Sequence, residues 1–132
     1  MEKTNTIDGK AVRFRATASV PRLYRLRFGR DIIQDMSQLA RAYQSATKPE
    51  MTEEEAQEAR FGVTDLTIFE NVAYIMAKHG APEETPGDIG EWLDGFETFS
   101  IYEILPEILE LWGLNEQTMA ESKKKFVQAA GK

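Results

Sequence analysis

An Asp-Gly pair at positions 8 and 9 is the feature that most constrains the fold of this chain. Asp-Gly tolerates the positive φ angles of a type I′ turn, which joins two antiparallel strands directly. After it, Val12, Phe14 and Ala16 alternate with more polar residues, a period of two that is typical of a strand with one buried face. An isolated hairpin is marginal in water, so we expect a helix or another chain to cover its apolar face. The predicted strands span residues 4–8 and 10–17.

The rest of the chain has the periodicity of amphipathic helices, with apolar residues recurring every three or four positions. The pattern predicts a small, mostly α-helical protein with an N-terminal β-hairpin, folded as one compact domain over residues 1–132. Within it we expect the hairpin at 4–17, a helical core at 20–114 and a C-terminal helix and tail at 115–132. The predicted helices cover residues 21–28, 31–44, 52–60, 65–80, 88–94, 100–112 and 115–130.

Several helix ends carry specific signals. Thr52-x-x-Glu55 and Ser100-x-x-Glu103 have the spacing of a capping box. Either Thr64 or Asp65 is expected to cap the helix that follows. Pro106 interrupts the last long apolar run, which predicts a kink or a new helix starting there. The glycines at positions 29, 80 and 113 are expected to terminate helices.

Composition excludes several classes of protein. The 132 residues contain no cysteine and one histidine, so disulfide frameworks, thiolate metal sites and multi-histidine metal sites are excluded. No apolar run approaches the roughly 20 residues needed to cross a bilayer, and the first residues lack the apolar centre of a signal peptide. We therefore expect a soluble protein of a reducing cytoplasm, with no membrane association.

Charge is distributed unevenly along the chain. Residues 1–50 contain ten Lys and Arg against five Asp and Glu, whereas residues 51–132 contain six against seventeen. The two halves could attract one another within one fold or between two copies, which leaves homo-oligomerisation open. The basic segment also allows a small nucleic-acid-binding regulator, although the net charge of −6 disfavours it. That alternative would use Arg22, Arg25, Arg27 and Arg30.

No group of residues favours catalysis. His79 lies in the last turn of a predicted helix, where we expect it to cap carbonyls and interact with the helix dipole. Glu103, Glu107 and Glu110 share one helix face, as do Glu54 and Glu58, a spacing typical of a solvated face. We predict no catalytic, cofactor-binding or metal-binding residues, and no enzyme activity.

Large aromatic residues are concentrated near the end of the helical region. They are typical of a hydrophobic core, and large aromatics also form the anchors of protein interfaces. The sequence leaves both interpretations open, and some residues could serve in both. The candidate partner-binding residues are Trp92, Phe96, Phe99, Tyr102 and Trp112.

Three segments together resemble a known family. They are TIDGKAVRFRATASVPRLYRLRFGRDIIQDM (Thr6 to Met36), FENVAYIMAK (Phe69 to Lys78) and WLDGFETFSIYEILPEILELW (Trp92 to Trp112). In this order they resemble the tail assembly chaperones of long-tailed phages and prophages of Gram-positive bacteria. The similarity runs from about Ile7 to Leu114 and contains no mechanistic signature motif.

The resemblance implies a non-catalytic, mostly helical protein with no cofactor. Members of the family bind the aggregation-prone tape-measure protein and help tail-tube subunits assemble around it. They act in the cytoplasm of the bacterial host and are absent from the mature virion. Many occur in a short form and a longer form made by ribosomal frameshifting, and the protein sequence leaves open whether this chain has a longer form.

Overall fold

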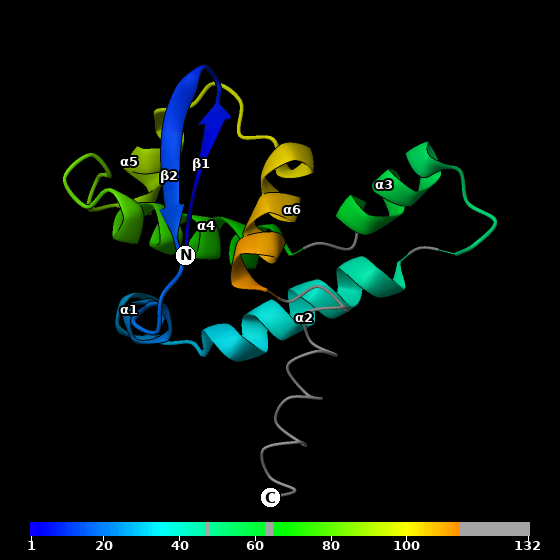
Figure 1. Cartoon of the computed structure of the whole chain (residues 1–132), viewed down its shortest axis with the longest axis horizontal. Coiled ribbons are helices and arrows are strands. Elements are labelled where there is room, and N and C mark those ends of the chain that lie inside the picture. The colour runs from blue at the N-terminus through cyan, green and yellow to red at the C-terminus, as the bar shows by residue number, and fades with distance from the viewer. Residues whose placement is uncertain (47, 63–64, 114–132) are drawn as a thin grey trace, which may run out of the picture.

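A computed structural model describes residues 1–46, 48–62 and 65–113 of the chain (Figure 1). The described part is mostly helical with an N-terminal two-stranded hairpin, which confirms the predicted fold class. The predicted helix at 115–130 lies outside the described residues. In chain order the elements are β1 (Glu2–Ile7), β2 (Lys10–Arg15), α1 (Val20–Phe28), α2 (Ile32–Ser45), α3 (Glu53–Gly62), α4 (Leu66–Gly80), α5 (Ile89–Asp94) and α6 (Ile101–Trp112).

The hairpin turns where the sequence predicts. Asp8 and Gly9 have φ angles of 53° and 76°, as a type I′ turn requires. Ile7 pairs with Lys10 across the turn, and backbone hydrogen bonds in both directions between Met1 and Ala16 close the far end of the ladder. β1 therefore starts and ends earlier than predicted, whereas β2 starts at Lys10 as predicted and ends two residues early, at Arg15.

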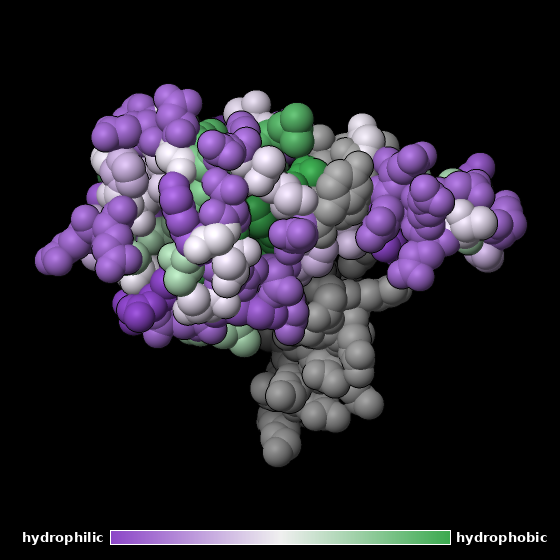
Figure 2. All heavy atoms as spheres, turned by 90° about the horizontal axis from the view of Figure 1, so that it is seen from above, coloured by the Kyte–Doolittle hydropathy of each residue, from purple (hydrophilic) through white to green (hydrophobic). Residues whose placement is uncertain are grey.

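Helix α4 lies at the centre of the fold and packs against β2, α1, α2 and α5 (Figure 1). Val12 and Phe14 on β2 are buried with apolar residues of α1, α2, α4, α5 and α6 in one cluster. The apolar face of the hairpin is thus covered by helices of the same chain. By contrast α3 protrudes from the body, and its surface is largely hydrophilic (Figures 1 and 2).

Two predicted helix starts are confirmed. The backbone N–H of Glu55 donates to Thr52 Oγ1 at 3.1 Å, so Thr52 caps α3, and its hydroxyl in turn donates to Glu55 Oε1 at 3.1 Å. Asp65, not Thr64, caps α4, because its Oδ1 accepts from the N–H of Ile68 at 3.1 Å.

One prediction for α6 is wrong, and of the two alternatives given for Pro106, a kink or a new helix, the second is excluded. Ser100 precedes the helix, but its side chain makes no capping bond, because the Glu103 N–H contacts the backbone carbonyl of Ser100 at 3.3 Å. No new helix starts at Pro106, which lies inside a single α6. Proline has no backbone N–H, so one helical hydrogen bond is missing there. The free energy gained by burying Leu105 and Ile108 on either side of it offsets the cost of that missing bond.

Gly80 has a role that the sequence did not indicate. Gly29 and Gly113 adopt the left-handed conformation of terminating glycines, with φ of 68° and 77°, as predicted. Gly80 does not have a positive φ and is the last residue of α4. A Cβ atom there would lie 2.9 Å from the carbonyl carbon of Arg13 and closer still to its oxygen. Glycine is needed because the end of α4 lies directly against β2.

Candidate partner-binding groove

Three of the five candidate aromatic residues lie together. The ring centroid of Trp92 is 5.5 Å from that of Phe96 and 5.2 Å from that of Phe99, both in edge-on geometry. Phe96 and Phe99 stack at 5.6 Å. Such pairs add to the stability gained by burial alone. Trp92 is only 6% exposed, while Phe96 and Phe99 are half-buried, so the cluster joins the core to the surface.

The other two candidates do not extend this cluster as far as the structure describes it. Trp112 is half-buried at the C-terminal end of α6, whereas the cluster lies in α5 and the segment before α6. The side chain of Tyr102 lies outside what the structure describes. Three of the five candidates therefore form one cluster, and Trp112 lies apart from it at the end of α6.

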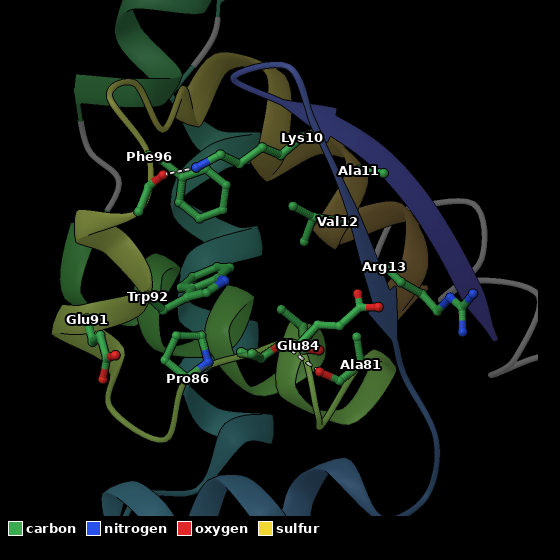
Figure 3. Close-up of a pocket in the computed structure, with 13 residues that line it drawn as sticks. Lys10, Ala11, Val12, Arg13, Ala81, Glu84, Pro86, Glu91, Trp92 and Phe96 are labelled. Carbon is green, nitrogen blue, oxygen red and sulfur yellow. Dashed lines mark hydrogen bonds between the residues drawn. The ribbon is translucent and has the colours of Figure 1, made fainter.

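A groove of about 260 Å³ opens between β2, the loop at 81–87 and α5 (Figure 3). Trp92 and Phe96 lie on one side and face Val12 of β2 on the other. The lining therefore combines apolar walls with a rim that carries both signs of charge, an arrangement typical of protein interfaces. The charged side chains at this rim are those of Lys10 and Glu84 (Figure 3).

The tip of the hairpin holds one end of the groove in place. The Lys10 ammonium donates to the carbonyl of Gly95 and lies 5.4 Å from the ring centroid of Phe96. Next to it, Asp8 Oδ2 accepts a hydrogen bond of 3.0 Å from the backbone N–H of Glu97. These contacts join residues almost ninety positions apart and fix the segment that carries Phe96.

The loop at 81–87 is also fixed in place. Thr85 is buried, and its hydroxyl contacts the carbonyls of Ala77 and Ala81 at 3.2 and 2.8 Å. Lys78 donates to the carbonyls of Pro82 and Thr85 at 2.9 and 2.7 Å. The groove thus lies between two braced walls, which lowers the entropic cost of binding a partner.

His79 does not cap the carbonyls of its helix, so that prediction is wrong. Its Nε2 lies 2.7 Å from Thr17 Oγ1, a contact that joins the end of α4 to the segment before α1. Burial, together with the positive charges of Arg15 and the N-terminus, lowers the pKa of His79 below its usual value. The fold therefore favours the neutral imidazole, in which one nitrogen accepts and the other donates.

The arginines of the basic segment divide into two pairs. Arg30 contacts Asp35 through two hydrogen bonds of 2.8 Å, and Arg27 donates to the carbonyl of Gly87 at 2.8 Å. Arg22 and Arg25 lie exposed on α1. Two of the four arginines predicted for nucleic-acid binding thus have partners within the fold.

The glutamates of α6 also differ in their surroundings. Lys3 of β1 forms ion pairs with Glu107 and with Glu110, the latter at 3.0 Å, while Glu103 is exposed. Glu54 and Glu58 are exposed on α3. Across residues 1–46, 48–62 and 65–113 there is no group of three or more His, Asp or Glu that could hold a metal ion. Within the same ranges, none of the helices is both long and apolar enough to cross a membrane.

Comparison with known proteins provides no further assignment: no protein-family model, no curated protein and no solved structure matches this chain.

Proposed function

We propose that this chain is a tail assembly chaperone of a long-tailed phage or prophage. In this role it binds the tape-measure protein and tail-tube subunits in the bacterial cytoplasm, performs no catalysis and is left out of the finished virion. The resemblance of three segments supports the proposal. In the fold these segments supply β2, α1, the start of α2, most of α4, the second half of α5 and all of α6, so they contain most of the packed core.

The groove beside Trp92 and Phe96 is the observation that carries the proposal. A tape-measure protein is a long helical rod with apolar stripes, which must be kept from aggregating until the tube covers it. A groove of about 260 Å³ accommodates one or two apolar side chains of such a stripe. Its mixed-charge rim and small size suit reversible binding, since larger apolar interfaces are typical of permanent complexes. The net charge of −6 would help to keep the complex in solution.

Nucleic-acid binding has less support as a second function. Base stacking and phosphate contacts would need arginines with free N–H groups. Among the four predicted arginines, the charge of Arg30 is neutralised by its two hydrogen bonds to Asp35, which leaves Arg22, Arg25 and the remaining N–H groups of Arg27. A regulator of this kind would bind DNA or RNA with a steep dependence on salt concentration.

Co-expression tests the proposed function. The tape-measure protein of the same genome is produced with and without this chain, and its soluble fraction is measured after lysis. The proposal predicts that the tape-measure protein becomes soluble, and co-purifies with this chain, only when both are present. If it stays insoluble and nothing co-purifies, the same test with any frameshifted longer form decides between an insufficient short form and a wrong proposal.

A further inference from the structure

A second surface lies between α1 and the C-terminal end of α4, and it shares no lining residue with the aromatic groove. Leu26 on α1 is 70% exposed and lines an open groove together with other aliphatic side chains, so it belongs to an exposed apolar patch. The groove has a volume of about 610 Å³. Its aliphatic lining consists of Leu23, Leu26, Ile75 and Pro82.

The charged residues that line this surface are all positive. Arg27 and Lys78 line the groove, and Arg22 and Arg25 are exposed on the same helix as Leu26. His79 also lines it, and no acidic residue does so among the described residues. A partner that fits must therefore present aliphatic side chains flanked by negative charge.

The positive groups at the rim are held in fixed positions. Arg27 donates to the carbonyl of Gly87 and lies over the ring of Tyr74, 5.2 Å from its centroid. Lys78 donates to two carbonyls of the loop at 81–87. Both side chains keep their charge while their geometry is set in advance, so little conformational entropy is lost when a carboxylate approaches.

We infer that this surface, formed by α1 and the end of α4, binds an acidic amphipathic helix of a partner protein. Such a helix would place aliphatic residues, spaced three and four apart, against Leu23 and Leu26. Its glutamates and aspartates would face the arginines of α1. This inference does not depend on the proposed function, because it concerns a different surface and any partner with such a helix.

Nucleic acid fits the same surface less well. Single-stranded nucleic acids bind by stacking bases on aromatic rings, and the described lining of this groove contains aliphatic residues with His79 as its single ring system. The ring of His79 is engaged with Thr17. Aliphatic side chains of a helix match Leu23, Leu26 and Ile75 better than bases do.

A synthetic peptide provides the test. The probe is a fluorescein-labelled helical peptide of about 18 residues, long enough to form five turns, with leucines along one face and glutamates beside them. Controls are a peptide of the same composition with the leucines scrambled, and a single-stranded DNA oligonucleotide. Binding to the full chain is measured by fluorescence anisotropy at low and moderate salt, and each variant is checked for folding by circular dichroism.

Leu26→Glu is the informative variant, with Leu66→Glu as its matched control. Leu66 is 58% exposed at the start of α4, so both changes place a glutamate at an exposed leucine of a helix. We expect Leu26→Glu to weaken binding of the peptide about tenfold or more, since it removes apolar contact and adds repulsion. Leu66→Glu should change the affinity less than about twofold, and the scrambled peptide should bind much more weakly.

Three results would overturn the inference. The first is equal binding of the scrambled peptide, which would mean that charge alone acts. The second is tighter binding of the oligonucleotide that is lost in Arg22→Glu/Arg25→Glu, which would assign the surface to nucleic acid. The third is a self-association, seen by sedimentation, that Leu26→Glu abolishes, which would assign it to a second copy of the chain.

Discussion

The hydroxyl of Tyr24 on α1 donates a hydrogen bond of 2.7 Å to a carboxylate oxygen of Asp35 on α2, and Asp35 is only 3% exposed. The same carboxylate accepts two hydrogen bonds from Arg30, which lies in the short connection between the two helices. The Arg30 guanidinium and the Tyr24 hydroxyl together outweigh burial and hold the pKa of Asp35 below its usual range. A buried charge that is satisfied in this way fixes the angle at which α1 meets α2.

Removing the hydroxyl in Tyr24→Phe should lower the free energy of unfolding by about 1–3 kcal/mol, the range for a hydrogen bond to a charged group. Urea denaturation followed by circular dichroism measures this change. In an Asp35→Asn background the same substitution should cost less, because the acceptor is no longer charged. Equal costs in both backgrounds would show that the hydroxyl does not act through the carboxylate.

The lowered pKa of His79 should make the free energy of unfolding depend on pH. Its pKa in the folded protein lies below the usual 6.5, so the unfolded chain binds more protons just below that pH. The contribution of His79 to stability is therefore present above pH 6.5 and is lost as the pH falls through the folded-state pKa. Because the chain has one histidine, His79→Gln should flatten this part of the curve of unfolding free energy against pH.

Glu70 affects stability with the opposite sign, because burial raises its pKa above the usual 4.5. Its contribution is lost as the pH rises, so it cannot produce the loss predicted for His79 on acidification. An unchanged slope in His79→Gln would contradict the role given to this histidine.

Gly80→Ala should destabilise the protein, although alanine is the better helix former. The new Cβ would overlap the carbonyl of Arg13, so α4 and β2 would have to move apart. We expect a loss of about 1–3 kcal/mol, typical of overpacking. Gly62→Ala, at the last residue of α3 with open space around it, is the control and should leave stability unchanged or slightly higher. Similar thermal midpoints for the two variants would rule out the steric explanation.

Alanine substitutions at Trp92, which is buried, and at Leu26, which is exposed, should have very different effects on stability. Trp92→Ala should lower the free energy of unfolding by about 3–5 kcal/mol, because it empties a buried site between Tyr74 and the phenylalanines. Leu26→Ala should change it by no more than about 0.5 kcal/mol. Chemical denaturation of both variants measures the difference, and comparable losses would mean that Leu26 is covered in solution.

Local signals in the sequence were sufficient for much of the fold. The Asp8-Gly9 turn, the Thr52 cap and the terminating glycines Gly29 and Gly113 depend on residues within a few positions of one another. Such features can be predicted because their geometry is set by the backbone and by neighbouring side chains.

Contacts between distant segments could not be predicted in the same way. Gly80 has the sequence context of a helix terminator, and only the approach of β2 shows why a side chain is excluded. Likewise, nothing near His79 indicates its contact with Thr17, 62 positions away. The aromatic residues were found by composition, but the groove beside them depends on where the hairpin tip meets the segment after α5.

The groove itself can be tested against its partner with a matched pair of variants. Glu84 lines the groove, whereas its neighbour Glu83 is also exposed and does not line it. The measurement is the amount of tape-measure protein that co-purifies with Glu84→Arg and with Glu83→Arg, which change the net charge equally. The proposed function predicts a clear loss for Glu84→Arg and wild-type recovery for Glu83→Arg. Equal recovery with both variants would contradict binding through this groove.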